Sequence, residues 1–125
     1  MKTKRVMKSG ASTRSRIPTR FQKFGQKYPS VMRAYEALGA ATQRAGPLDT
    51  KTRALVKLAI ATGAWREGAV HSHTRRALEA GCTPDEIHHV ILLATTTLGF
   101  PSMMAALTWT DDVLTRKGRV SRTFG

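Results

Sequence analysis

Apolar residues recur along most of the chain at the spacing of one face of an α-helix. One such repeat consists of Val31, Ala34, Tyr35 and Leu38, and a second consists of Ile87, Val90, Ile91, Ala94 and Leu98. Spacings of three and four residues place such positions on one side of a helix. No stretch shows sustained alternation of apolar and polar residues flanked by hairpin turns, which is the pattern of strands. The sequence therefore predicts an all-α fold.

Turn and capping residues divide this pattern into helices. Ile17-Pro18 predicts an extended entry, with Phe21 and Phe24 as anchors onto the body of the protein. Ser30 is the predicted cap of a first helix. That helix is expected to end at Gly46-Pro47. The first ordered helix is thus expected only after residue 29.

A second helix is predicted to start at Asp49 and to end near Gly63. Its central run, residues 54–61, is apolar except for Lys57. A surface helix normally has a polar face, and this run is too continuously apolar to provide one. The second helix is therefore expected to be central and buried.

The third and fourth helices are separated by two clear local signals. Gly81 stands where a glycine usually ends a helix, which closes a third helix over residues 65–81. Thr83-Pro84-Asp85-Glu86 combines a cap, a proline at the first helical position and the glutamate of a capping box. A fourth helix is therefore predicted from residue 83 to Gly99.

Phe100-Pro101 opens a fifth predicted helix. Its inward positions are Met103, Leu107 and Leu114, and its outward positions are Asp111, Asp112 and Arg116. Short connections favour antiparallel neighbours. We expect one helical bundle of about five to six helices over residues 17–117, preceded by a basic arm, 1–16, and followed by a basic tail, 118–125.

Charge adds a second layer to this picture. The 125 residues carry a formal net charge of +13, and the first acidic residue is Glu36. Basic residues are concentrated before it and in residues 116–122. Such ends attract nucleic acid or an acidic partner, but they are also typical of solvated arms or of arms lying on a neighbouring subunit. A transit peptide is disfavoured because residues 1–16 contain few apolar positions.

Cys82 is the single cysteine, so no disulfide can form within one subunit. This count suits a reducing compartment. No apolar run approaches the length of a membrane span, and no apolar signal segment lies near Met1. We therefore expect a cytoplasmic protein without a membrane partner.

Candidate chemistry gathers on the third helix. Glu67 and His71 are four residues apart on one side of its apolar stripe, and His73 lies roughly 200° around the axis from His71. The two imidazoles therefore cannot hold one metal ion from this helix alone, and no metal or cofactor is expected. His73 can alternatively be a neutral structural histidine, and His88 and His89 are expected at the surface or at an interface.

Three segments together carry a resemblance to a known family. They read L-D-T-K-T-R-A-L-V-K-L-A-I-A, H-S-H-T-R-R-A-L-E-A-G-C-T-P-D-E-I and L-G-F-P. From about Pro47 to Leu114 the chain resembles the carboxymuconolactone decarboxylase family, which includes the alkylhydroperoxidase D-like proteins. The resemblance implies a helical domain that assembles as a homo-oligomer, either a trimer or a hexamer.

The peroxidase branch of this family is similar to a thiol enzyme with C-x-x-C followed four residues later by histidine. His73 matches that histidine, but Arg66 and Ala69 occupy the cysteine positions. Peroxide reduction needs a thiolate and a resolving partner, so dithiol peroxidase activity is not expected. Cys82 is expected to be a small apolar residue packed beside Ile87.

The decarboxylase branch is similar through a motif written E-L-R-x-H-x-R-x-A-L. His73, Arg75, Ala77 and Leu78 match it, while Ala69 and His71 replace its glutamate and arginine. Loss of CO₂ from a lactone acid needs a cation for the carboxylate and a proton donor for the enolate. The resemblance implies His73 as general acid or base, tuned by Glu67 and His71, with Arg66 or Arg75 binding an anionic substrate.

Two functions follow from these observations. The first is a small cofactor-free enzyme, of the lyase type, acting on a lactone acid or keto acid. The second is an oligomeric binding module whose thiol site has been lost and whose basic arms engage nucleic acid or an acidic partner. Access of solvent to His73 would favour the first function.

Overall fold

The computed structural model of the chain describes residues 18–116. All regular structure among these residues is helical, which confirms the predicted all-α fold. The chain divides into two compact units, Met1–Pro47 and Leu48–Gly125. This boundary falls inside the single bundle expected over residues 17–117. The basic arm and the basic tail lie outside the described residues.

The first unit contains α2, Thr19–Lys27, and α3, Pro29–Arg44. Pro18 precedes α2, so Phe21 and Phe24 belong to a helix and the expected extended entry is wrong. Proline has no amide N–H to donate, and residues at the start of a helix do not need to donate one to the helix backbone. A helix can therefore start at this position without losing a hydrogen bond. α3 starts at Pro29, with Tyr28 rather than Ser30 at the cap. The ring of Phe24 packs against that of Tyr28, with centroids 5.1 Å apart.

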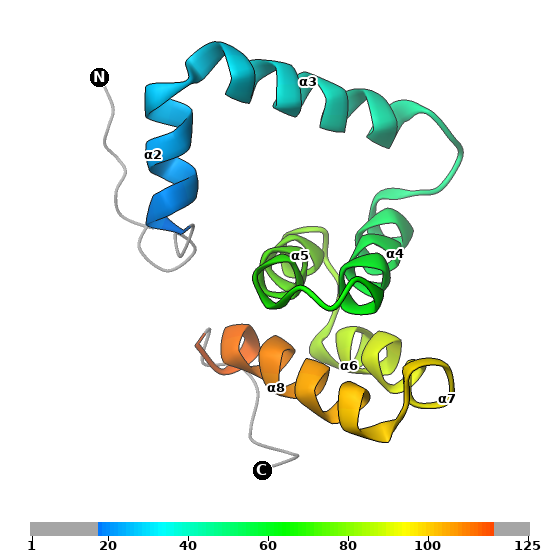
Figure 1. Ribbon diagram of the computed structural model, residues 1–125. Helices are drawn as coiled ribbons and strands as arrows, with labels where there is room; N and C mark the ends of the chain where they lie inside the picture. The colour runs from blue at the N-terminus through cyan, green and yellow to red at the C-terminus, as the bar shows by residue number, and fades with distance from the viewer. Residues whose placement is uncertain (1–17, 117–125) are drawn as a thin grey trace. The chain divides into compact units, whose positions relative to one another are not determined.

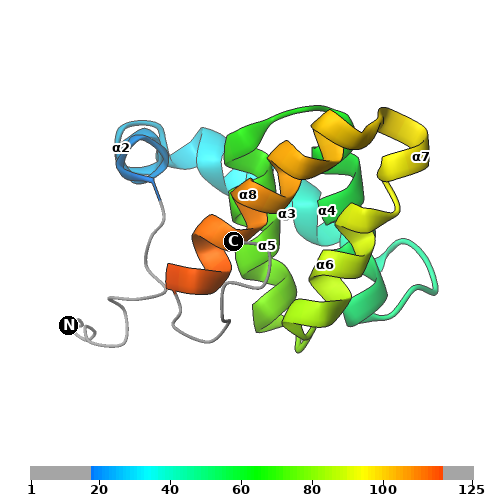
Figure 2. The same ribbon diagram turned by 90° about the horizontal axis from the view of Figure 1, so that it is seen from below.

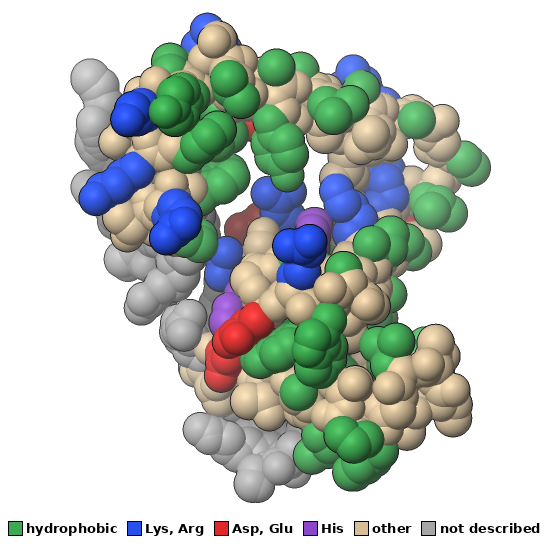
Figure 3. Space-filling view, viewed as in Figure 1, with side chains coloured by type: hydrophobic (Ala, Val, Ile, Leu, Met, Phe, Trp, Pro, Cys, Tyr) green, Lys and Arg blue, Asp and Glu red, His purple; other side chains and the backbone are tan. Residues whose placement is uncertain are grey.

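Neither helix of the first unit has a buried residue. The apolar repeat of α3 is formed as predicted, but Val31, Tyr35 and Leu38 are all more than half exposed. Figure 3 shows apolar side chains following one another along α2 and α3. These apolar stripes are therefore largely solvent-exposed in the single chain.

The second unit contains the core. Its elements are α4, Thr50–Gly63; α5, Glu67–Glu79; α6, Pro84–Leu92; α7, Thr95–Leu98; and α8, Phe100–Arg116. α4 and α5 lie side by side, and α6 and α8 form a second layer against them (Figures 1 and 2). The core between the layers contains Leu58, Ala61, Val70, Ala77, Cys82, Ile87, Ile91, Met103, Ala106, Leu107 and Leu114. The predicted inward residues of the fifth helix are confirmed.

Caps fix where these helices start and end. The Asp49 carboxylate accepts a hydrogen bond from the Thr52 amide at 2.8 Å, as a helix cap does. Thr83 and Glu86 form the predicted capping box, with hydrogen bonds of 3.1 and 2.8 Å. Gly81 has a φ of +94°, and the Cys82 amide donates back to the Ala77 carbonyl, which closes α5 by a Schellman turn.

Two expectations for the core helices are wrong. α4 is not buried on all sides, because the Val56 side chain is 41% exposed and that of Ile60 is 65% exposed. The fourth helix does not run unbroken to Gly99 but stops at Leu92 and is followed by α7. α7 starts with three successive threonines, whose hydroxyl groups compete with the helical backbone bonds. The Thr95 hydroxyl donates to the Leu92 carbonyl at 2.6 Å.

Candidate functional site

α5 carries the predicted site residues and has two polar edges. Val70, Thr74 and Ala77 form its fully buried stripe, as the sequence predicts. His71 and His73 are both half-buried and leave opposite sides of this stripe. Each imidazole therefore has its own set of neighbours.

His73 lies among cations. Burial lowers the pKa of His73 most strongly, and the charges of Lys57 on α4 and Arg76 on α5 lower it further. All three effects disfavour the imidazolium form. Among residues 18–116, no hydrogen bond to the His73 ring is found. The site therefore presents a half-buried, neutral imidazole beside two positive charges.

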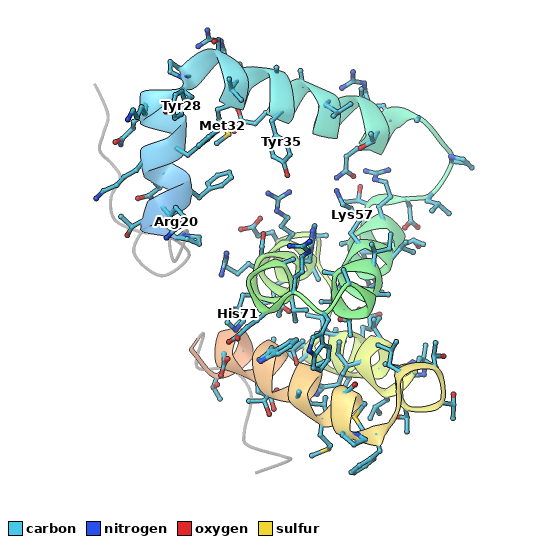
Figure 4. The ribbon with its side chains drawn as sticks, viewed as in Figure 1. Arg20, Tyr28, Met32, Tyr35, Lys57 and His71 are labelled. Carbon is cyan, nitrogen blue, oxygen red and sulfur yellow. The ribbon has the colours of Figure 1, made fainter. Side chains whose placement is uncertain are left out.

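Figure 3 shows Lys and Arg side chains gathered around a histidine over α4 and α5. Lys57 is the charged residue within the apolar run of α4, and Figure 4 shows it on that helix. Arg76 follows His73 by three residues, so both stand on one face of α5. A small carboxylate bound here would be held by the two cations and would offset their effect on the neighbouring imidazole.

The other side of α5 is acidic. His71 Nε2 lies 3.0 Å from Asp112 Oδ2 on α8 and 3.9 Å from Glu67 Oε2 one turn back on α5. In Figure 4 the His71 side chain extends from α5 toward α8. The three side chains are partly exposed, and their ligand atoms all lie within 4.8 Å of one another. This group alone, within residues 18–116, meets the spacing expected of a metal-binding cluster.

A second histidine pairs with the preceding aspartate. His88 Nε2 on α6 lies 2.8 Å from Asp111 Oδ1 on α8. His88 is only 7% exposed, so its expected surface position is wrong. Asp111 and Asp112, expected to point outward, instead contact two different helices because successive residues lie about 100° apart on α8. His89 is exposed, as predicted.

The structure thus brings together only some of the predicted site residues. Glu67 and His71 do meet, and they share Asp112 as a neighbour. The charged residues that act on His73 are Lys57 and Arg76. Arg66 stands exposed at the cap of α5, and Arg75 is half-buried on the same helix.

Lys57, Arg76 and Asp112 are not among the predicted site residues, and the sequence signals for these three residues differ in strength. Lys57 interrupts an apolar run, and that interruption was the available signal for a functional cation. Arg76 was visible only as a neighbour of His73 on the helical wheel. Asp112 lies far from His71 in the chain, and no local pattern connects the two.

Cys82 is a core residue. It is 4% exposed and packs in the same cluster as Ile87. Burial raises the pKa of the Cys82 thiol, and the charge of Glu86 acts in the same direction. The thiol form, which is a poor nucleophile, is therefore favoured.

No helix within residues 18–116 is long and apolar enough to cross a membrane.

Comparison with known proteins places this arrangement among described relatives. A family model described as the carboxymuconolactone decarboxylase family matches residues 29–112. The crystal structure of the apo form of a carboxymuconolactone decarboxylase family protein from Legionella pneumophila is similar, with a TM-score of 0.67 and 26% identity. This likeness covers 78% of the present chain and 88% of the Legionella chain.

A protein of Haemophilus influenzae, described as uncharacterized, is 38% identical over 63 residues. The matched region is 50% of the present chain and 56% of that relative. The chain therefore spans little more than half the length of this curated relative.

Proposed function

The chain belongs to the carboxymuconolactone decarboxylase family, and from this premise we propose that it is a small enzyme acting by acid-base chemistry on an anionic lactone acid or keto acid. One observation carries the proposal: the half-buried imidazole of His73 stands beside the cations Lys57 and Arg76. Such a grouping provides both a proton carrier and a binding site for a carboxylate.

The two cations have the binding role. Lys57 and Arg76 hold a substrate carboxylate through charge-assisted hydrogen bonds, and their position on two packed helices fixes the substrate next to His73. Arg66, at the cap of α5 and seven residues before His73, is a candidate for a contact to a more distant part of the substrate. Arg75 lies two residues after His73, roughly 200° around the helix, and so leaves the side of α5 that carries His71. His73 is only half-buried, so part of it remains accessible to this substrate.

His73 has the proton-transfer role. When the bond to the carboxylate carbon breaks, its electron pair passes to the neighbouring carbonyl group as an enolate and CO₂ leaves. The substrate carboxylate offsets the charges of Lys57 and Arg76 and so lets the His73 ring take up a proton before the reaction. The resulting imidazolium donates this proton to the enolate carbon, and the ring regains a proton from water. Glu67 and His71 lie close to Asp112 on the other side of α5, away from His73. We therefore assign proton transfer to His73 alone.

Release of CO₂ from a panel of β-keto acids and lactone acids tests the proposal. His73→Asn should lower kcat by roughly 10² to 10⁴, the usual contribution of general acid-base catalysis. Lys57→Gln should instead raise KM, because it removes a charge that binds the carboxylate. A thermal melt of each variant shows whether the fold is retained.

Two matched variants control for nonspecific effects. His89→Asn removes an exposed imidazole from α6, and Lys51→Gln removes one charge from the first turn of the helix that carries Lys57. Both should retain wild-type kcat and KM. Equal turnover by wild type and a folded His73→Asn protein would contradict the proposed mechanism. Absence of both turnover and carboxylate binding in the wild type would contradict the function itself.

A further inference from the structure

We propose that Glu67, His71 and Asp112 form a binding site for one divalent transition metal ion of the Zn²⁺ class. The three residues come from two packed helices, α5 and α8, and together offer one imidazole nitrogen and two carboxylate oxygens. This inference does not depend on the proposed enzyme function. It assigns a ligand to the side of α5 that His73 does not use.

The spacing of the ligand atoms fits such an ion. Zn²⁺ binds nitrogen and oxygen at about 2.0 to 2.2 Å, so two ligand atoms of a tetrahedral site lie about 3.4 Å apart. The distances from His71 Nε2 are 3.0 Å to Asp112 Oδ2 and 3.9 Å to Glu67 Oε2, one on each side of that value. The ligand atoms of the remaining pair, Glu67 and Asp112, lie within 4.8 Å of each other, so Glu67 must move closer to Asp112 to complete the site. The Glu67 side chain is 57% exposed, which leaves it room to change rotamer.

The donor set favours a transition metal over a hard cation. Imidazole nitrogen is a ligand for Zn²⁺ and its neighbours in the first transition row, whereas Mg²⁺ and Ca²⁺ select oxygen. Two carboxylates also neutralise a divalent ion, which removes most of the Coulomb cost of placing it in a chain of net charge +13. Two of only eight acidic residues meet at this one imidazole.

The neighbouring His88–Asp111 pair shows what a purely structural pair looks like. His88 is buried and lies 2.8 Å from the carboxylate of Asp111. At His71 the side chain is 25% exposed and two carboxylates converge from opposite helices. Solvent access leaves coordination positions for water, as three-ligand zinc sites require.

Zn²⁺ titration of the full chain, stripped with EDTA, tests the site by calorimetry. We expect one ion per chain in the wild type. Asp112→Asn and His71→Asn should weaken binding by more than the roughly 10- to 100-fold that loss of an outer-shell partner causes. Co²⁺ provides an independent readout through its visible spectrum, which reports a nitrogen and oxygen ligand set and is lost in the same variants.

Exposed residues outside the cluster provide matched controls. Glu79→Gln changes another exposed glutamate of α5, and His89→Asn changes an exposed histidine of α6. Both should bind Zn²⁺ like the wild type. Glu67→Gln alters only a largely exposed side chain, so it tests the site even if the other variants fail to fold. Zn²⁺ should raise the Tm of the wild type, and this shift should shrink in Glu67→Gln.

The competing outcome is an ion pair only, in which His71 and Asp112 hold α5 against α8 and bind no metal. Wild type that binds no Zn²⁺ under these conditions would establish that outcome. Binding of equal strength in wild type, Glu67→Gln and Asp112→Asn would locate the ion elsewhere. Either result would overturn the proposal and leave the assignment of His73 untouched.

Discussion

The indole ring of Trp65 packs against that of Trp109, with centroids 4.7 Å apart and ring planes inclined by 52°. Trp65 links α4 to α5, and its φ of 59° is the only positive value at a non-glycine residue within 18–116. A left-handed backbone costs a residue with a Cβ atom roughly 1 to 2 kcal/mol. An aromatic pair contributes about 0.5 to 1.5 kcal/mol, so the contact with Trp109 offsets much of this cost.

Replacement of Trp65 separates the two effects. Trp65→Ala removes the ring and keeps the unfavourable backbone, whereas Trp65→Gly removes both. We expect the glycine variant to be the more stable of the two by about 1 kcal/mol in urea unfolding. At neighbouring Ala64, whose φ is −78°, Ala64→Gly should instead destabilise the protein. A glycine variant at residue 65 that is less stable than the alanine variant would refute this account.

The more deeply buried pair of His88 and Asp111 should contribute more stability than the partly exposed pair of His71 and Asp112. Asp111→Ala removes a hydrogen-bonding partner of a buried imidazole, and we expect a loss of about 1 to 3 kcal/mol. Asp112→Ala, measured with EDTA present, should cost less because water can replace the lost contact. Chemical denaturation of both variants checks the order, and equal losses would contradict it.

Cys82 should be inert in the folded protein. Its burial raises the pKa of the thiol, so little thiolate forms at neutral pH. A chromogenic disulfide reagent should react with Cys82 only on unfolding in urea. Cys82→Ser should leave any native activity unchanged. Peroxide turnover with a thiol reductant that is lost in Cys82→Ser would reverse this interpretation.

Acid should weaken the caps of α4 and α6. Hydrogen bonds from Thr52 lower the pKa of the Asp49 carboxyl below its ordinary 3.8, and hydrogen bonds from Thr83 and Lys51 lower that of Glu86 below 4.5. Between the ordinary and the lowered pKa values the unfolded chain binds more protons than the folded chain. The free energy of unfolding therefore decreases as the pH decreases through this range. Stability from both groups is complete above about pH 4.5 and is lost as the pH falls through the folded pKa values.

Asp49→Asn isolates one of these contributions. Its Tm should lie below that of the wild type at pH 7, and the difference should shrink at pH 3, where the wild-type carboxyl also becomes protonated. Asp85→Asn changes an exposed carboxylate on α6 for which no such hydrogen bond is found in the described part of the chain. A pH-independent difference for Asp49→Asn would show that its charge plays no part.

Exposed apolar residues on α4 lead us to expect self-association, and the family resemblance implies a trimer or a hexamer. Val56 and Ile60 are exposed in the single chain although they belong to an almost wholly apolar run. Light scattering should give a mass well above the 13.7 kDa of one chain. Ile60→Glu should lower that mass with helicity retained. A stable wild-type monomer would contradict the expectation.

Local chemistry made most helix ends of the second unit predictable. Asp49, Gly81, Thr83 and Glu86 act through neighbours within a few residues, so their roles can be inferred from spacing alone. α2 was missed because its apolar residues are few and the preceding proline was interpreted as the start of an extended segment. The break between α6 and α7 was missed because the apolar repeat continues across it.

The candidate site was less predictable because its contacts are long-range. His73 and the meeting of Glu67 with His71 follow from the helical wheel of one helix. The partners Lys57 and Asp112 depend on how α4 and α8 pack on α5, which helical periodicity does not specify. The helical wheel predicts His88 at the surface or at an interface because it lies on a face away from Ile87 and Ile91. Its burial depends on a carboxylate supplied by another helix.

Two consecutive aspartates fix the rotational setting of α8. Asp111 faces His88 on α6, and Asp112 faces His71 on α5. Rotation of α8 by one residue position, about 100°, would bring Asp112 toward His88 but turn the apolar Val113 toward His71. Of these two settings, only the native one gives a carboxylate to each imidazole. The polar pairs therefore favour the same alignment of α8 that buries Met103, Leu107 and Leu114.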